Sequence, residues 1–241
     1  MKSNSEHALL TITWNEKLIF PHWYTYYSQF YDDTDIYVLD NGSDDGHLDG
    51  YQFAEVKRLV EKHPGFIDRD MHIRVVADKY AQLQERYKTV LFCEVDEFVV
   101  PDKEKWSDLA HFRGELNRQA VQCMGWEPTH MLGEQPIDFS SRPWLRQRRC
   151  WRRNDQYDKT ALSTRPITWG VGFHHASLKQ GELGARADLY MIHIQFMCRD
   201  LISKRWAARS DRCYNQKDPI AHVEGACYYA EEIPEKWRDA L

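Results

Sequence analysis

Three carboxylates within four residues make positions 94–97 the segment of this sequence best suited to chemistry. Glu94, Asp96 and Glu97 lie between the apolar side chains of Phe92 and Phe98. Like charges crowded in an apolar setting are unfavourable unless a cation or a proton offsets them. In an extended strand Glu94 and Asp96 would point to one face and could share a hard cation such as Mg²⁺ or Mn²⁺. A strand end whose acids point to solvent or cap a turn explains the same residues, and the segment alone leaves both interpretations open.

A second acidic segment, DNGSDDG at residues 40–46, follows another apolar run. Asp40 could accept hydrogen bonds from a ribose or a nucleobase, and Gly42 and Gly46 would let a ligand approach the backbone closely. An ordinary turn built from Asp, Asn and Gly uses the same residue types, and the segment by itself favours that interpretation.

The elements that have to position these acids are expected to alternate along the first hundred residues. Hydrophobic patterning predicts strands over 8–13, 35–39, 72–77 and 89–93, and helices over 19–30, 53–60 and 79–88, with a stop at 63–65. Such alternation is typical of βαβ units, in which ligands bind beyond the carboxyl ends of the parallel strands. We therefore predict a Rossmann-type α/β sandwich with a mainly parallel central sheet flanked by helices, and both acidic segments at strand ends.

The second half of the chain is less regular. It predicts a helix over 107–118 capped by Ser107, strands over 168–174 and 189–196, and a helix over 199–215. No repeat, low-complexity tract or linker divides the chain, so one domain over 1–241 is expected.

An arginine-rich segment, RPWLRQRRCWRRN at 142–154, carries six arginines and two tryptophans. In a helix, Arg142, Arg146, Arg149 and Arg153 would form one basic face. Such a face suits a diphosphate, an acidic acceptor or an anionic membrane surface. A solvated lid that pairs with nearby acids is the alternative.

Composition narrows the class of protein. Of 241 residues 42% are hydrophobic, which is enough for a sizeable core. The net charge of −5 disfavours a general nucleic-acid-binding protein. The six cysteines contain no C-x-x-C pair, so we expect them to be reduced and the protein to be cytoplasmic. No apolar leader and no run of 18 apolar residues is present, so no signal peptide or membrane span is expected.

Three linked segments resemble the GT-A glycosyltransferases, especially the family 2-like members with a D-x-D-E-F signature. They are TITWNE at 11–16, DIYVLDNGSDDG at 35–46 and CEVDEFVVPD at 93–102. The resemblance implies a GT-A-like domain whose residues 1–102 bind a nucleotide-sugar and a metal, and whose residues 103–241 bind the acceptor. The implied reaction moves a sugar, most simply from a UDP-sugar, to a glycan or another hydroxyl, with Mn²⁺ or Mg²⁺ bridging the donor diphosphate. No nucleic-acid partner is implied, and peripheral membrane contact stays open.

The resemblance also implies roles for individual residues. The implied donor-binding residues are Asn15, Glu16, Asp40, Asn41, Glu94 and Lys159. The implied metal ligands are Asp96 and His193. Glu94 stands where the family usually has Asp, which keeps the charge on a longer side chain. Ser203 and Lys204 follow His193 in the next helix, as in similar members, whereas a satisfied core histidine is the alternative for His193.

The sequence does not rank the candidates for the catalytic base. An inverting transfer needs a carboxylate that deprotonates the acceptor hydroxyl, and Glu127, Asp155 and Asp158 lie in the appropriate half. We take Glu127 and Asp155 as the candidates, and a retaining mechanism would need neither in this role. Two other functions stay open: a non-catalytic nucleotide- or sugar-binding module of the same fold, and a nucleotidyltransferase. A nucleotidyltransferase has less support, because this sequence has no Gly-, Lys- or Arg-rich phosphate loop after the first predicted strand.

Overall fold

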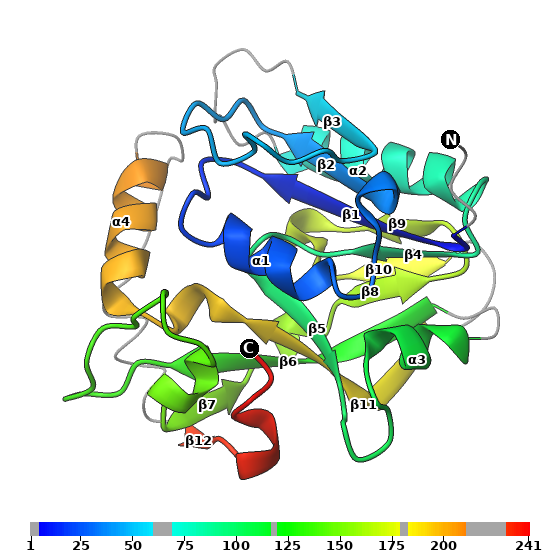
Figure 1. The fold of residues 1–241 in the computed structure, drawn as a ribbon. Helices are drawn as coiled ribbons and strands as arrows, with labels where there is room; N and C mark the ends of the chain where they lie inside the picture. Colours follow the sequence, from blue (N-terminus) through cyan, green and yellow to red (C-terminus); the bar gives the residue numbers. More distant parts are fainter. Residues whose placement is uncertain (1–4, 60–68, 117–119, 179–182, 211–229) are drawn as a thin grey trace.

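A computed structural model describes residues 5–59, 69–116, 120–178, 183–210 and 230–241. Within these residues the centre is a ten-stranded mixed sheet with helices packed against it (Figure 1). A separate two-stranded sheet lies beside it. The predicted α/β sandwich with a central sheet flanked by helices is confirmed.

The N-terminal half supplies the parallel part of the sheet. Its strands are β1 (His7–Thr13), β2 (Ile36–Asp40), β3 (Glu55–Arg58) and β4 (Thr89–Phe92), in the order β3-β2-β1-β4. All three pairings between them are parallel. Their carboxyl ends therefore meet at one edge of the sheet, where ligands bind in folds of this kind.

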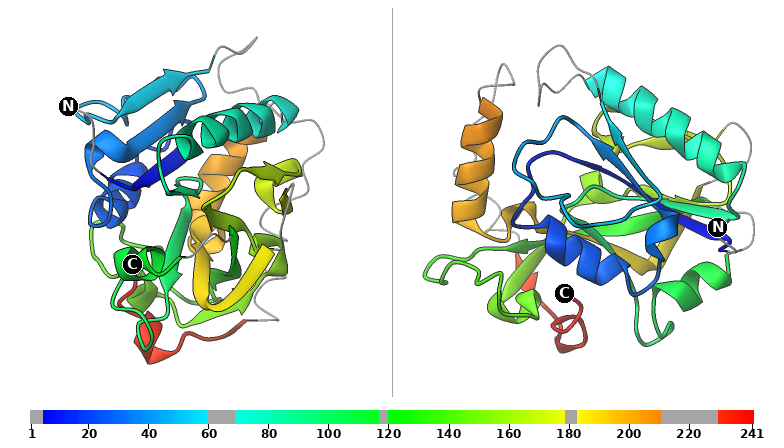
Figure 2. Two further views of the ribbon diagram at one scale, coloured as in Figure 1. Left: turned by 90° about the vertical axis from the view of Figure 1, so that its right-hand side faces the viewer. Right: turned by 45° about the horizontal axis from the view of Figure 1, so that its top comes forward.

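The two faces of these strands are covered by different helices. Because side chains alternate along a strand, Leu9 joins the hydrophobic cluster of α1 (Phe20–Tyr27), whereas Leu10 joins that of α2 (Arg69–Gln84). Figure 2 shows α1 and α2 on opposite sides of β1 and β2. Burial on both faces explains why β1 and β2 read as continuous apolar runs.

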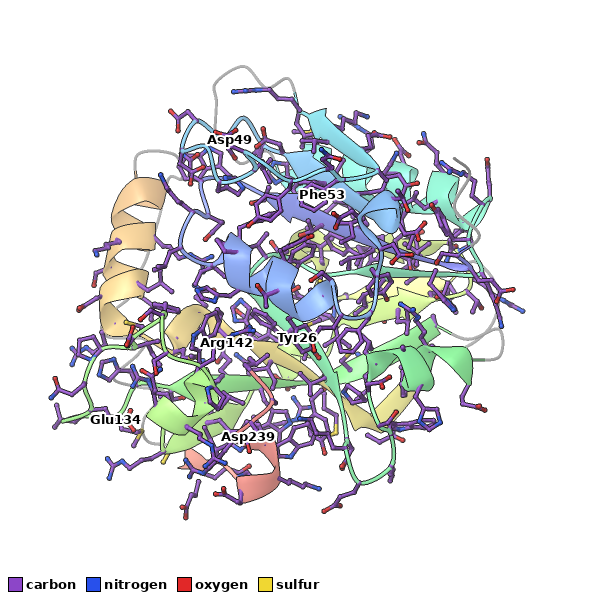
Figure 3. The ribbon with its side chains drawn as sticks, in the orientation of Figure 1. Tyr26, Asp49, Phe53, Glu134, Arg142 and Asp239 are labelled. Carbon is purple, nitrogen blue, oxygen red and sulfur yellow. The ribbon has the colours of Figure 1, made fainter. Side chains whose placement is uncertain are left out.

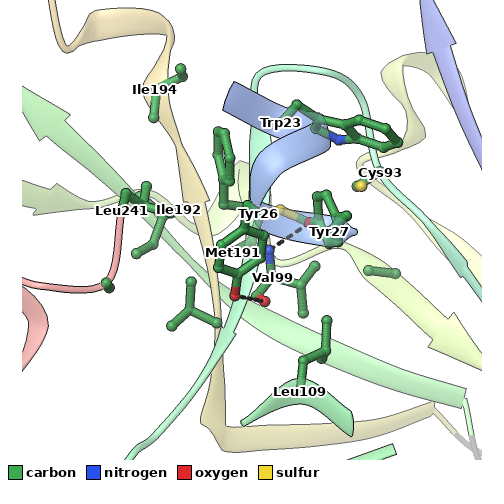
Figure 4. Close-up of a cluster of buried hydrophobic side chains, with 14 of the residues drawn as sticks. Trp23, Tyr26, Tyr27, Cys93, Val99, Leu109, Met191, Ile192, Ile194 and Leu241 are labelled. Atoms are coloured by element: carbon green, nitrogen blue, oxygen red, sulfur yellow. Dashed lines mark hydrogen bonds between the residues drawn. The ribbon is translucent and has the colours of Figure 1, made fainter. Parts of the chain in front are cut away.

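Strand β5 (Glu97–Pro101) leaves the turn that follows β4 and pairs with β11 along one edge. Two tyrosines of α1 satisfy the backbone on its other edge. The Tyr26 hydroxyl donates to the carbonyl of Val99 at 2.8 Å, and the amide of Val99 donates to the Tyr27 hydroxyl at 2.9 Å (Figure 4). The tyrosines therefore substitute for a neighbouring strand and hold the start of β5 in place.

The C-terminal half adds mostly antiparallel strands and short helices. Its helical elements are α3 (Leu109–Gly114), α4 (Arg199–Ser210) and the 3-10 turns η2 (Trp144–Gln147), η3 (Asp155–Tyr157), η4 (Val171–Phe173), η5 (Ile194–Phe196) and η6 (Glu235–Trp237); η1 (Asp33–Asp35) precedes β2. Its strands are β6 (Ala120–Thr129), β7 (Cys150–Arg153), β8 (Thr160–Ser163), β9 (Ile167–Trp169), β10 (Ala176–Leu178), β11 (Leu183–His193) and β12 (Glu231–Glu232). The long strand β6 pairs with β7 and β8 in antiparallel and with β11 in parallel orientation.

Two predicted elements have the opposite type. The segment predicted as a helix from residue 53 contains strand β3, which adds to the edge of β2. The segment 72–77, predicted as a strand, belongs to α2. The β-branched residues of this segment led to the strand prediction. In the structure Val76, Tyr80 and Leu83 are buried against the sheet at helical spacing. Tertiary packing outweighs β-propensity here.

Smaller differences concern helix ends and the arginine segment. Asp108, not Ser107, caps α3, because its carboxylate accepts from the amide of His111 at 2.8 Å. Residues 171–173 form η4, so the strand predicted over 168–174 ends at Trp169. The basic helical face predicted over 142–153 is wrong, because the segment is the 3-10 turn η2 followed by strand β7.

Some expectations fall outside the described residues. These are the helix stop at 63–65, the end of the last predicted helix at 211–215, and Cys213 and Cys227. The four cysteines that the structure describes are free thiols: Cys93, Cys123, Cys150 and Cys198. None of the described helices has the length and apolar character needed to cross a membrane.

A glycine in β6 allows η3 to pack closely on the sheet. A Cβ at Gly125 would lie 2.4 Å from the carbonyl oxygen of Asn154 and 2.5 Å from the Cβ of Tyr157. Both are too close for any side chain, so only glycine fits without movement of η3.

We expect Gly125→Ala to lower the free energy of unfolding by about 2 kcal/mol or more, because η3 has to shift. Gly114→Ala is the matched control, since a Cβ there meets nothing within 4 Å. It should change stability by about 1 kcal/mol at most. Urea unfolding checks both, and equal stability of the two variants would contradict the packing described.

Candidate functional site

Charged side chains from seven separate parts of the chain meet where the parallel strands end. We call this set the charged cluster, and its members are Glu16, Glu94, Asp96, Glu97, Glu127, Arg152, Lys159, His193 and Arg205. Glu16 follows β1, residues 94–97 follow β4, and His193 ends β11. Helix α4 carries Arg205 beside this edge (Figure 1).

Residues 94–96 form a turn between β4 and β5, so Glu94 and Asp96 do not share one face of a strand as predicted. The amide of Glu94 donates to the carboxylate of Glu97 at 2.9 Å, which closes the turn. The two acids then find different cations. Glu94 pairs with Lys159, and Asp96 pairs with Arg205.

Lys159 is a buried counter-ion to two glutamates. Its Nζ donates to Glu94 Oε2 at 2.8 Å and to Glu97 Oε1. Burial lowers the pKa of Lys159, but Glu94 and Glu97 outweigh it and raise that pKa above its usual value. Burial raises the pKa of Glu97. For Glu94, burial acts in the same direction, but the Lys159 charge prevails and the pKa is lowered. Lys159 is 3% exposed, so the residue predicted to bind donor is engaged inside the protein.

Asp96 is the point where Arg205 and His193 meet. Its Oδ2 accepts from the Arg205 guanidinium at 2.7 Å and lies 3.6 Å from His193 Nε2. The other end of the guanidinium contacts Glu16 Oε1 at 2.5 Å. Burial alone lowers the pKa of Arg205, but the carboxylates of Glu16 and Asp96 raise it beyond its ordinary value. One arginine therefore joins the loop after β1 to the turn after β4.

The other side of His193 faces Glu127. Glu127 Oε1 lies 3.4 Å from His193 Nδ1, and its Oε2 accepts from Arg152 at 2.6 Å and from Asn154 at 3.0 Å. The Tyr157 ring stacks on the imidazole with ring centroids 4.0 Å apart. Both ring nitrogens of His193 thus face carboxylates, which is not the arrangement of a core histidine satisfied by neutral partners.

Glu127 is fully buried, and its neighbours favour its charged form. Burial raises the pKa of its carboxyl, but His193, Arg152 and Asn154 outweigh burial and lower it. Asp155, the other candidate base, lies in η3 and is exposed. Asp158 accepts from the amide of Gly125 at 2.8 Å and pairs with Arg153 at 2.5 Å, which is a structural role.

The loops after β1 and β2 are tied to each other. Asn15 adopts a positive φ of 49°, and its side chain exchanges hydrogen bonds with Asp44 at 2.8 and 2.9 Å. Asp40 accepts from the amide of Ser43 at 2.9 Å, and the amide of Asn41 donates to Thr13 at 2.9 Å. The turn interpretation of residues 40–46 therefore describes their backbone, and it leaves Asp40 and Asn41 at the carboxyl end of β2.

A buried histidine holds the same loop from inside. His47 Nε2 lies 2.9 Å from the Thr13 hydroxyl, and His47 Nδ1 contacts Asp45 at 2.5 Å. Burial raises the pKa of Asp45, but the bonds from His47 outweigh it and lower that pKa. The acids of DNGSDDG thus serve mainly to shape the loop.

The arginines of 142–153 go to different partners, because a 3-10 turn followed by a strand sends successive side chains in different directions. Arg146 pairs with Asp239 at 2.6 Å, and Arg149 lies 3.4 Å from Glu134. Arg152 is the one that enters the charged cluster. Most of these arginines pair with nearby acids, as the alternative expected, but the segment is not a solvated lid, because Trp144, Arg148 and Trp151 are buried.

A cavity of about 700 Å³ lies away from the charged cluster. Tyr26, Arg142 and Asp239 are among the residues that line it, and Figure 3 labels all three. No member of the charged cluster lines this cavity. In the parts of the chain that the structure describes, no group of three or more His, Cys, Asp or Glu side chains is arranged to hold a metal ion.

Sequence reasoning missed three side chains of the site. Arg205 directly follows Ser203 and Lys204, which the sequence singled out and which are exposed. Arg152 was one of six candidate arginines, and alternation along a strand could have separated it from its neighbours. Tyr157 gave no signal, because its stacking on His193 depends on contact between segments 36 residues apart.

No family model and no curated protein matches this sequence. Among solved structures, the chain is similar to the mannosyltransferase PcManGT from Pyrobaculum calidifontis, solved with GDP-Man and Mn²⁺. The two share 14% sequence identity with a TM-score of 0.42, over 93% of this chain and 69% of the other. The function proposed below therefore rests on the side chains of this chain.

Lys159→Met removes the charge between Glu94 and Glu97 and keeps the apolar stem. At pH 8 we expect the free energy of unfolding to fall by about 3–5 kcal/mol, because two carboxylates lose their buried partner. Without the ammonium, burial of the Glu97 side chain raises the pKa of its carboxyl above the unfolded value. Folding then favours protonated Glu97, so the stability of the variant falls as the pH rises from the unfolded pKa of this carboxyl to its raised folded pKa. The deficit against the wild type should be smaller at pH 5 than at pH 8.

Urea unfolding at both pH values measures these deficits. Lys105→Met is the control, because Lys105 is exposed and lies 3.8 Å from Asp188, a pair that contributes little. Adding Glu97→Gln to Lys159→Met should restore part of the lost stability. Equal deficits at the two pH values would show that the glutamates do not depend on Lys159.

Proposed function

We propose that this protein is a divalent-metal-dependent glycosyltransferase of the GT-A type, which transfers a sugar from a nucleotide-sugar to a hydroxyl acceptor such as a glycan. The observation that carries the proposal is the convergence of Glu16, Asp96 and His193 at the carboxyl edge of the parallel strands. These residues come from the ends of three different strands, at the edge where α/β folds bind their ligands.

The two side chains that could ligate a metal, Asp96 and His193, suit a cation that also binds the substrate. Asp96 Oδ2 and His193 Nε2 lie 3.6 Å apart, and both atom types ligate Mn²⁺. Two protein donors are few for a stand-alone site. They fit a cation that takes its other ligands from phosphate oxygens and water.

The charge of the cluster supports the same conclusion. Five carboxylates meet three permanent cations among the described residues, so negative charge is in excess when the acids are ionised. Bound at Asp96 and His193, Mn²⁺ or Mg²⁺ would stabilise the negative charge that develops on the departing nucleoside diphosphate.

The remaining roles follow from position. Asp40 and Asn41 at the end of β2, with Asn15 in the adjoining loop, are proposed to contact the nucleoside, most simply that of a UDP-sugar. Glu94, held by Lys159, is proposed to face the ribose or a water on the metal. The C-terminal half then contributes acceptor contacts around η3, next to Tyr157.

For the base we propose Asp155 over Glu127. Asp155 is exposed on η3, so an acceptor hydroxyl can reach its carboxylate. Glu127 is inaccessible and bound to Arg152 and Asn154, so it is proposed to orient His193. A carboxylate that holds the far nitrogen of a ligating histidine fixes its tautomer and ring orientation.

A non-catalytic nucleotide- or sugar-binding module is the second candidate. One observation favours it: Lys159 and Arg205 already neutralise Glu94 and Asp96, as in a site that has become structural. Such a module would bind donor and metal without transferring sugar.

A thermal-unfolding screen with UDP- and GDP-sugars, each with and without Mn²⁺, tests the proposed function. A donor present at 100 times its dissociation constant should stabilise the protein by about 2.7 kcal/mol, and only with Mn²⁺ present. Asp96→Asn should abolish the stabilisation, and Asp96→Ala should lower turnover about 10²–10³-fold. Asp138→Asn, at an exposed acid in a loop, is the control. No stabilisation by any donor would overturn the proposal, and binding without transfer would favour the module.

Two further variants test whether Asp155 is the catalytic base and whether Glu127 positions His193. With the donor identified, Asp155→Asn should lower kcat about 10²–10⁴-fold and leave donor stabilisation by Mn²⁺ unchanged. Glu127→Gln should weaken Mn²⁺ binding itself, because His193 loses its orienting charge. Steady-state kinetics together with direct Mn²⁺ titration makes the distinction. An unchanged kcat in Asp155→Asn would remove Asp155 from the mechanism.

A further inference from the structure

We propose that Arg205 is an internal cation that competes with the divalent metal for Asp96, and that the guanidinium released by the metal then binds the donor diphosphate. The inference rests on the proposed function, and it assigns a role to a residue that no sequence motif singled out. It makes metal and donor binding interdependent.

The competition follows from a shared oxygen atom. Asp96 Oδ2 accepts from Arg205 at 2.7 Å and is also the atom that lies 3.6 Å from His193 Nε2. A metal ion bound between the facing atoms of Asp96 and His193 would use that oxygen. Because a guanidinium and a divalent cation repel each other when both contact one carboxylate, metal binding disfavours the contact between Arg205 and Asp96.

Arg205 is a largely buried member of the charged cluster, and it forms ion pairs with two of the other members. Its side chain is 11% exposed, and it bridges Glu16 and Asp96, which follow different strands. In the absence of metal it offsets two carboxylates that would otherwise repel each other across the site. The arginine thus keeps the site assembled before any ligand arrives.

The guanidinium also has an unused donor. Its Nε is buried and has no hydrogen-bond partner among the described residues. A buried N–H without an acceptor is costly, and a phosphate oxygen would satisfy it. An arginine fork matches phosphate geometry, so a diphosphate beside the metal is the partner that the freed side chain would take.

The position of Arg205 makes the exchange feasible. The residue lies in the second turn of α4, a helix beside the sheet (Figure 1), and its guanidinium contacts Glu16 and Asp96. Nη1 pairs with Asp96 and Nη2 with Glu16, so the proposed exchange releases one nitrogen of the guanidinium while the other keeps its contact.

Direct binding of Mn²⁺, followed by the electron paramagnetic resonance of the free ion, tests the competition without any turnover. Arg205→Gln should bind Mn²⁺ at least about tenfold more tightly than the wild type when no nucleotide is present, because a neighbouring positive charge is gone. Arg205→Lys should fall between the two, because an ammonium cannot span Glu16 and Asp96 as the fork does. Arg146→Gln removes the same charge at a remote exposed pair and should leave Mn²⁺ affinity unchanged.

The second half of the proposal is measured by calorimetric titration with UDP and GDP at saturating Mn²⁺. Arg205→Gln should bind the preferred nucleoside diphosphate at least about tenfold more weakly than the wild type, since one charged phosphate contact is lost. The same titration on Arg146→Gln should match the wild type.

The outcomes separate this inference from the proposed function. If the wild type binds Mn²⁺ and a nucleoside diphosphate, but Arg205→Gln and Arg205→Lys bind Mn²⁺ no more tightly, the competition is wrong and the proposed function stands. If the wild type binds neither, the proposed function itself fails. Should Arg205→Gln not fold, the tighter Mn²⁺ binding expected of Arg205→Lys decides the matter.

Discussion

Carboxylates that are removed from water need counter-ions, and this requirement determines how the two halves of this protein pack together. The N-terminal half places Glu16, Glu94, Asp96 and Glu97 at the edge where its parallel strands end, and it supplies no cation to that cluster from its described residues. Taking ionised groups out of water costs several kcal/mol each unless they are paired. All three cations of the charged cluster come from the C-terminal half, so the two halves can form this site only together.

The rest of the fold keeps the acidic turn in register with those cations. Tyr26 and Tyr27 hold the backbone of β5, which starts directly after the turn. Gly125 lets η3 lie against β6, which brings Tyr157 onto His193. These contacts are uncharged and well packed, and they position groups whose own interactions would be unfavourable if the distances were wrong. A rigid scaffold of this kind is what a preorganised binding site requires.

Local patterning predicted the parts of the fold in which neighbouring residues decide the outcome. The apolar runs that form β1, β2 and β4 were predicted because strands buried on both faces are apolar throughout. The segment 72–77 was predicted with the wrong type, because its β-branched residues are equally compatible with a helix face buried on the sheet. Strand β3 was missed for the converse reason: it is a short edge strand with exposed side chains, so it carries no strong pattern.

The sequence by itself determined which acids lie at strand ends and that His193 closes an apolar strand, because composition and periodicity act over a few residues. Only the tertiary structure decided which cation neutralises each acid. Lys159 lies more than sixty positions from Glu94, and Arg205 more than a hundred from Asp96. Charges attract whatever their separation in the chain, so no local pattern records such a pairing. The folded sheet selects the partners by bringing its strand ends and α4 to one edge.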